Sequence, residues 1–315
     1  MAFLQFLGHV IVVVSSFGLV VGTFFRLTVK DAVPYFALFY YASPPILLAL
    51  AAFILAGRTW FLKQPRRATA LFFLALLLAG WWHWTTYQTP AGSRESSEGI
   101  SRSVLFWNVQ DVRAGWPKLI EEIRQYDPDL IGLVEVESGG QVQHAAIERA
   151  FPEYQPLFVG HGYLLVRGEW LSHQRDSLGN KSEFAVATAR FDDGTELEVA
   201  LVDINANPFL PRGPALRSLA EKLSGIPPRR LCLMGDFNTP PDSIYFEAFR
   251  ERLENIFEVQ GEGYHVTWPV PVPVLCLDQI WLPKGATRTA AYHSTRLSDH
   301  RLVTATFVVH DAGRP

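Results

Sequence analysis

Asp236 and Asn238 stand two positions apart directly after an apolar run, in the segment LCLMGDFNTPPDS at residues 231–243. Side chains alternate between the two faces of a strand, so an extended chain points this carboxylate and this amide to the same side. That arrangement suits a functional site. A turn uses the same residue types, so the pair alone does not decide between the two.

Other polar side chains also stand beside apolar runs. A charge that is buried without a partner costs several kcal/mol, so each of these groups requires compensation. Any one of them fits a turn, a surface charge or a cap, but the ordered set is hard to obtain from independent turns. The positions are Asn108, Glu135, Asp236, Asn238, Asp278, Asp299 and His300.

The order of these residues resembles the endonuclease/exonuclease/phosphatase superfamily, the deoxyribonuclease I-like enzymes. The resemblance is carried by the strings FWNVQ, LVEVES, GDFN, LDQIW and SDHR and spans about residues 102–309. It implies a catalytic domain at residues 104–310, built as a four-layer sandwich of two mixed β-sheets flanked by helices.

The resemblance also implies a metal and a base. Glu135 and Asp299 would bind Mg²⁺, a hard cation that prefers oxygen ligands, with Mn²⁺ and Ca²⁺ as alternatives. Asp236 would orient and deprotonate the attacking water.

The remaining residues would handle the phosphate and the leaving group. Asn108 and Asn238 would donate amide hydrogens to the phosphate. His300 would contact the phosphate or protonate the leaving oxygen, and Asp278 would fix the tautomer of that imidazole.

One segment departs from the family pattern. Many relatives carry a His before a Pro-containing stretch at the end of a central strand, whereas LVDINANPF places Asn205 there. An amide can donate a hydrogen bond but cannot become a cation. Asn205 is a candidate phosphate contact, with a plain turn residue as the alternative, and Asp203 is a weaker candidate.

The periodicity of residues 104–309 agrees with this fold class. Short apolar runs alternate with amphipathic ones, which indicates an α/β or α+β sandwich with a two-sheet core. The predicted helices cover 116–126, 144–150, 214–223 and 244–253. The predicted strands cover 104–107, 130–134, 163–166, 184–191, 197–204, 230–234, 277–281, 286–292 and 302–309.

The first part of the chain has the composition of a membrane anchor. Up to Tyr87 only seven side chains are charged, whereas 22 of 28 basic and 30 of 31 acidic residues follow, which gives that part a formal net charge of −8. Uncharged runs at 3–25, 33–57 and 68–84 are near or above the roughly 20 residues that span a bilayer. We expect three transmembrane helices in residues 1–87, although prolines make one straight helix less certain in the second run.

A cleaved signal peptide is the alternative for the first run, and a buried soluble helical bundle is the alternative for all three. The loop between the second and third runs is the more basic one, which predicts that it faces the cytoplasm. The chain would then be a multi-pass protein of the cell membrane with its catalytic domain outside the cytoplasm, like a membrane-anchored bacterial branch of the superfamily. Residues 88–103 are polar and rich in small residues, so we expect a flexible linker there.

These features predict a membrane-anchored phosphoesterase that hydrolyses a phosphodiester or phosphomonoester, either a lipid headgroup or a small phosphorylated metabolite. The net charge, and the lack of a basic cluster denser than Arg229 with Arg230, weigh against tight binding of duplex nucleic acid. An extracytoplasmic endo/exonuclease and a pseudoenzyme that binds a ligand or protein are the alternatives. Cys232 and Cys276 are expected to be two separate buried thiols, with a disulfide as the alternative.

Overall fold

The computed structural model describes residues 2–89, 99–136, 140–160 and 162–309. The chain divides into two compact units, Met1–Tyr87 with Asn207–Gly213, and Gln88–Ala206 with Pro214–Pro315. Most of the predicted linker, residues 90–98, lies outside the described residues.

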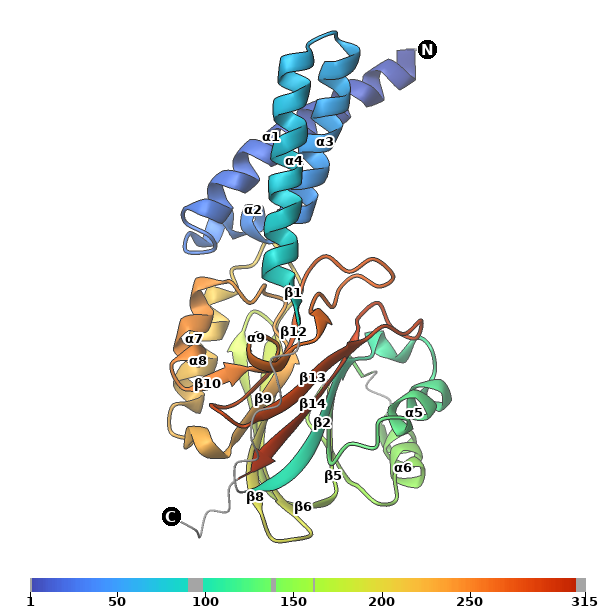
Figure 1. Ribbon diagram of the computed structural model, residues 1–315. Coiled ribbons are helices and arrows are strands. Elements are labelled where there is room, and N and C mark those ends of the chain that lie inside the picture. Colours follow the sequence, from blue (N-terminus) through green and yellow to red (C-terminus); the bar gives the residue numbers. More distant parts are fainter. Residues whose placement is uncertain (1, 90–98, 137–139, 161, 310–315) are drawn as a thin grey trace. The chain divides into compact units, whose positions relative to one another are not determined.

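The first unit is helical (Figure 1). Its elements are α1 (Ala2–Leu27), the 3₁₀ helix η1 (Pro34–Phe36), α2 (Ala37–Tyr41), α3 (Pro45–Phe61) and α4 (Pro65–Thr86). Small and branched residues of α1, α3 and α4 form its core, among them Leu19, Leu48, Ala52 and Leu78. Many larger apolar side chains point outward instead, as expected for helices in contact with lipid.

Within the described residues, α1 from Gln5 and α4 are each long and apolar enough to cross a membrane. The second predicted span is bent by 67° between Pro34–Tyr41 and Pro45–Phe61. Pro44 and Pro45 stand at this break, where their rings and missing N–H groups prevent one continuous helix. The unit therefore has two such helices, or three if the bent pair is one span.

The second unit contains two six-stranded mixed sheets within the described residues. In order, the first sheet is β13 (Thr287–His293), β14 (Leu302–Val309), β2 (Ile100–Asn108), β3 (Leu130–Val134), β5 (Tyr163–Val166) and β4 (Gln155–Phe158). The second is β10 (Leu253–Asn255), β12 (Asp278–Pro283), β9 (Leu231–Asp236), β8 (Glu196–Asp203), β7 (Ser182–Phe191) and β6 (Gly168–Gly179). This confirms the predicted α/β fold with two mixed sheets.

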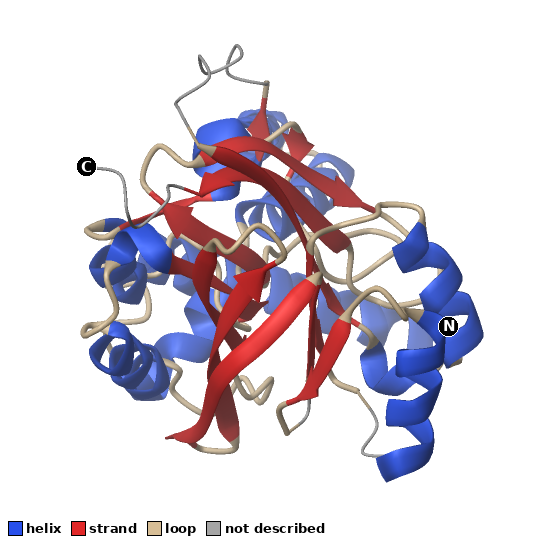
Figure 2. Cartoon of the chain, turned by 90° about the horizontal axis from the view of Figure 1, so that it is seen from below, coloured by secondary structure: helices blue, strands red, loops and turns tan. Residues whose placement is uncertain are grey.

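Apolar clusters hold the layers of this unit together. One cluster lies between the two sheets and includes Phe106 and Met234. Helices α5 (Trp116–Arg124) and α6 (Gly140–Ala150) cover the outer face of the first sheet, and α7 (Gly213–Leu223) and α8 (Glu247–Arg250) cover that of the second. Figure 1 shows these helix pairs beside different sheets, and Figure 2 shows the strands in red between helices.

Each sheet contains one parallel pair, β2 with β3 and β8 with β9. The intervening helices α5 and α7 carry the chain back between the paired strands, so each pair presents its carboxyl ends at one edge. Asn108 and Asp236 are the last residues of β2 and β9. The topology therefore places Asn108 and Asp236, which are distant in sequence, at the carboxyl-terminal edges of the two sheets, where a site can form.

Several details differ from the sequence predictions, among them one helix and one edge strand. The helix predicted at 244–253 is the short helix η4 (Ile244–Phe246) followed by α8, because residues 253–255 pair with β12 instead. Strand β6 was not predicted because its polar, largely exposed residues lack the apolar alternation of a half-buried strand. Cys232 and Cys276 are both buried and free, which confirms two separate thiols.

Gly235 lets the parallel strands β8 and β9 approach each other closely. A Cβ added to Gly235 would lie 2.2 Å from the carbonyl oxygen of Val202, its register partner. We predict that Gly235→Ala destabilises the full chain by about 1–3 kcal/mol, the usual cost of overpacking. Gly225→Ala is the matched control, because nothing lies within 4 Å of its added Cβ. Thermal unfolding in micelles measures both, and equal midpoints would contradict the prediction.

Candidate active site

The candidate site is assembled from strand ends and one loop of the second unit. Asp236 ends β9 and Asp278 begins β12, and the antiparallel register places these two residues opposite each other. His300 comes from the loop before β14, where its backbone carbonyl accepts a hydrogen bond from the Trp107 indole at 3.2 Å. Three segments distant in sequence therefore meet at one point.

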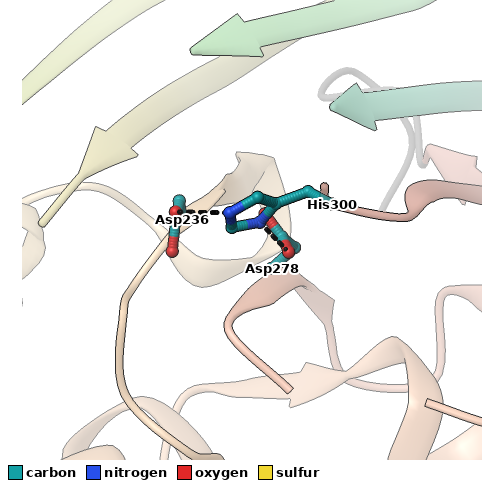
Figure 3. A group of neighbouring side chains, drawn as sticks. All are labelled: Asp236, Asp278 and His300. Atoms are coloured by element: carbon teal, nitrogen blue, oxygen red, sulfur yellow. Dashed lines mark hydrogen bonds and ion pairs between the residues drawn. The ribbon is translucent and has the colours of Figure 1, made fainter. Parts of the chain in front are cut away.

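His300 lies between two carboxylates (Figure 3). Its Nδ1 is 2.8 Å from Asp278 Oδ2, and its Nε2 is 4.0 Å from Asp236 Oδ2. All three side chains are buried, and one ligand atom from each lies within 4.8 Å of the others. This buried Asp/Asp/His group has the composition of a metal site and also that of an acid–base pair with an orienting acid.

Two asparagines hold the Asp236 carboxylate. Asn108 Nδ2 donates to Asp236 Oδ2 at 3.0 Å, and the backbone N–H of Asn238 donates to Oδ1 at 2.8 Å. Asn238 also donates through Nδ2 to the Ile204 carbonyl at 2.8 Å. Both asparagines therefore meet Asp236.

The local geometry of Asn238 differs from the sequence prediction. Strand β9 ends at Asp236, and Asn238 has φ 47°, so the two residues do not share the face of one strand. The turn still brings them together, because Asp236 Oδ1 caps the backbone N–H two residues later.

The electrostatics of the site oppose ionisation of Asp236. Burial and the Asp278 charge raise the pKa of Asp236 to about 7, although His300 and the asparagine hydrogen bonds act in the other direction. Burial alone would lower the pKa of His300, but the charge and hydrogen bond of Asp278, with Asp236, raise it to about 10. The site therefore favours an imidazolium next to a carboxylate that can exchange a proton near neutral pH.

Glu135 and Asp299 are the predicted metal ligands. Glu135 directly follows β3 and has a left-handed backbone with φ 52°. Asp299 Oδ2 accepts a hydrogen bond from the Trp268 indole at 3.1 Å. Among the described residues, the buried Oδ1 atoms of Asp299 and Asp278 have no hydrogen-bond partner. Buried carboxylate oxygens require compensation, and a divalent cation with its water ligands would supply it, so these two oxygens fit a hard metal ion. Metal binding by Glu135 stays a prediction.

Asp203 lies beside the group, and Asn205 follows it two positions later. The backbone N–H of Asn205 donates to Ser182 Oγ at 3.0 Å, and its contact with a phosphate stays a prediction. Asp203 is the register partner of Asp236 in the parallel pair. Burial, followed by the charges of Asp236 and Glu135, raises the pKa of Asp203 well above its ordinary value.

The structure adds positioning residues that the sequence analysis did not assign to the site. Thr267 Oγ accepts hydrogen bonds from the N–H groups of Leu277 and Asp278 at 3.0 and 3.2 Å. Its neighbour Trp268 holds Asp299. Both residues lie in the segment YHVTWP, and a Thr and a Trp in a loop give no local sign of such distant partners.

Ser298 links the loop that carries His300 to β2 by hydrogen bonds. Its hydroxyl donates to the Asn108 carbonyl at 2.8 Å and accepts from the N–H of His300 at 3.0 Å. In the sequence this serine is the first letter of SDH, where a local cap was an adequate explanation. Its partner Asn108 lies 190 positions away, which no local pattern indicates.

Comparison with known proteins decides the family. The family model described as Endonuclease/Exonuclease/phosphatase family matches residues 105–300, more than half of the chain. The chain belongs to the endonuclease/exonuclease/phosphatase family. Its general activity is therefore metal-dependent hydrolysis of phosphoesters. The buried Asp/Asp/His site is suited to this chemistry.

Several solved structures share the fold at low identity. A family protein from Bacteroides thetaiotaomicron is 16% identical, with TM-score 0.54 over 68% of this chain and 100% of that one. The human Nocturnin catalytic domain with bound sulfate is 18% identical, with TM-score 0.52 over 67% and 94%. The 3′ phosphatase NExo from Neisseria, bound to a product DNA hairpin, is 17% identical, with TM-score 0.52 over 65% and 99%. No curated protein matches the chain.

We predict that Asp236→Asn abolishes hydrolysis without lowering stability. The wild-type carboxyl has its pKa raised from 3.8 to about 7. The folded state therefore keeps a proton that the unfolded state releases, and stability falls as the pH rises through this window. The amide does not titrate, so the variant does not lose stability in this way. Its unfolding midpoint should equal or exceed that of the wild type at about pH 8, and the difference between the two midpoints should shrink at about pH 5. A midpoint clearly below wild type at the higher pH would contradict this account.

The charge of Asp278 should control the protonation of His300. We predict that Asp278→Asn lowers the pKa of His300 from its value of about 10, because burial then acts without its main opposing charge. Histidine ring NMR signals of the full chain, titrated with pH, measure this pKa. Asp192→Asn, at an exposed turn, is the control and should leave the titration unchanged. An unshifted His300 in Asp278→Asn would show that another group supports the imidazolium.

Proposed function

We propose that this protein is a membrane-anchored, Mg²⁺-dependent phosphoesterase that acts on a phosphodiester or phosphomonoester on the extracytoplasmic side. The observation that carries the proposal is the buried Asp236, His300 and Asp278 group beside the unsatisfied Asp299 oxygen. A buried carboxylate with a pKa near neutrality is suited to general base catalysis, and a charged imidazole is suited to general acid catalysis.

In the proposed reaction, Asp236 accepts a proton from a water molecule. The water oxygen forms a bond to phosphorus while the bond from phosphorus to the leaving oxygen breaks. His300 donates a proton to that leaving oxygen, and Asp278 orients the ring through Nδ1. The two asparagine NH₂ groups each carry a second hydrogen, which can bind a phosphoryl oxygen.

We assign the cation to Glu135 and Asp299. Bound there, Mg²⁺ would neutralise negative charge on the phosphoryl oxygens. The Asp236, Asp278 and His300 group is the other candidate for the cation.

The substrate argument rests on charge and on the apolar helices. The chain after Tyr87 carries a formal net charge of −8, and Asn205 cannot provide the cation that many relatives have at that place. Both features oppose tight binding of a nucleic-acid polyanion. Helices that can cross a membrane support a substrate at its surface, such as a lipid headgroup or a small phosphorylated metabolite.

The side of the membrane follows from the basic residues. Arg58, Lys63, Arg66 and Arg67 lie between and at the adjoining ends of α3 and α4, and such clusters favour the cytoplasm. With three spans, the large unit would lie on the opposite side. Protease added to intact cells should then digest that unit, whereas protection until the cells are lysed would reverse the orientation.

Activity of the full chain in lipid nanodiscs tests the proposal. We expect hydrolysis of a lipid or small-molecule phosphoester in a panel that also contains nucleotides and plasmid DNA. It should require Mg²⁺, stop with EDTA, be lost in Asp236→Asn and persist in the exposed control Asp192→Asn. Plasmid nicking without activity on the other esters would support the nuclease alternative. No metal-dependent hydrolysis of any ester would leave the pseudoenzyme alternative.

A further inference from the structure

The segment Asn207–Gly213 belongs to the helical unit, although β8 and α7 on either side of it belong to the other unit. Its sequence, NPFLPRG, contains two prolines, one phenylalanine and one arginine. The segment begins two residues after Asn205. A segment distant in sequence therefore contributes to the helical unit through its own contacts.

Arg212 makes these contacts. Its side chain is only 6% exposed, and its guanidinium lies 4.2 Å from the centre of the Tyr41 ring, with which it also interacts by hydrogen bond and charge. The Tyr41 hydroxyl donates to Asp31 Oδ2 at 3.3 Å, and Asp31 is 1% exposed. A buried arginine is tolerated only where a counter-charge and hydrogen bonds compensate it. Tyr41 and Asp31 provide this compensation, so Arg212 is an anchor for the loop.

Phe209 is exposed, in contrast to the buried Arg212. It is 75% exposed, whereas Leu210 and Pro211 are half-buried. Asn207 Oδ1 accepts the N–H of Phe209 at 3.0 Å, and the Asn207 carbonyl accepts that of Leu210, so a defined turn presents the ring. Transfer of a phenylalanine side chain out of water is worth about 1.5–3 kcal/mol.

Other aromatic residues of the helical unit are exposed, and they lie close in sequence to the partners of Arg212. Tyr35 and Phe36, in η1 between Asp31 and Tyr41, are 93% and 49% exposed. Aromatic rings gather at the boundary between membrane and water, where they contact both lipid chains and headgroups. The loop and η1 thus have the composition of an interfacial surface in a unit that is otherwise apolar.

We propose that Asn207–Gly213 is a lipid-contacting loop, with Phe209 inserted into the interfacial layer of the bilayer and Arg212 fixing the loop to the helices. This inference rests on the proposed membrane anchoring. The partner is the bilayer itself, because the loop belongs to the unit whose outer surface is apolar. A second copy of the chain is the competing partner.

Spin labelling of the full chain in phosphatidylethanolamine and phosphatidylglycerol nanodiscs tests the insertion. A nitroxide is attached at Phe209→Cys, or at Gln174→Cys on the exposed strand β6 as the control, and the two native thiols are buried. We expect the label at 209 to be more accessible to oxygen than to a water-soluble nickel chelate, and the label at 174 to show the reverse. Equal accessibility ratios at the two positions would overturn the proposal, as would dipolar broadening at 209, which would place a second copy there.

The anchor is tested by adding Arg212→Ala to Phe209→Cys. Loss of the anchor should increase the mobility of the label and reduce its depth, and an unchanged depth would refute the role of Arg212. Mg²⁺-dependent hydrolysis of the soluble ester bis(p-nitrophenyl) phosphate should be unaltered in Phe209→Cys, since this residue is outside the catalytic group. Inactivity of every form would count against the proposed function but not against insertion. Failure of the chain to enter nanodiscs would refute the anchoring and the inference together.

Discussion

One buried carboxylate determines the chemistry of this site. Asp236 is 1% exposed, and both of its oxygens accept hydrogen bonds from asparagine N–H groups. Burial and the neighbouring Asp278 disfavour its charge, while these hydrogen bonds and His300 limit the effect and leave the pKa at about 7. A base works best when its pKa lies near the working pH, so the contacts that hold Asp236 also prepare it to take a proton.

The fold supplies the constraint that brings the partners to this carboxylate. The parallel pairs β2–β3 and β8–β9 place Asn108 and Asp236 at carboxyl ends, and the antiparallel strand β12 brings Asp278 opposite Asp236. Gly235 permits the close approach of β8 and β9 immediately before Asp236. Stability and function therefore oppose each other here, since the fold encloses acids that would be more stable in water.

The sequence predicted the elements that are buried on both faces and left the irregular parts open. The runs at 130–134 and 302–309 are strands with the predicted bounds, because their apolar residues pack against both neighbouring layers. Polar strand ends next to such runs indicated Asp236, Asp278 and His300. The exposed edge strand β6 gave no such signal, since its only regular partner is β7.

What the sequence could not predict depends on contacts between distant segments. The side-chain bond of Asn238 to a carbonyl of the β8 end, the Thr267 hydroxyl that accepts from Asp278 and the Ser298 hydroxyl that donates to Asn108 are all tertiary hydrogen bonds. The division of labour among the acids has the same origin. Asp236 and Asp299 are both aspartates next to apolar segments, and only their partners in space distinguish the proposed base from the proposed metal ligand.

Manganese binding to the full chain, followed by loss of the free-ion EPR signal, tests this division most directly. The account predicts that Glu135→Gln and Asp299→Asn each weaken binding by about tenfold or more, since even outer-shell changes at metal sites cost 10–100-fold. Asp236→Asn should retain the ion. Wild-type affinity in Glu135→Gln and Asp299→Asn, together with loss of binding in Asp236→Asn, would place the cation in the Asp236, Asp278 and His300 group and contradict the assigned roles.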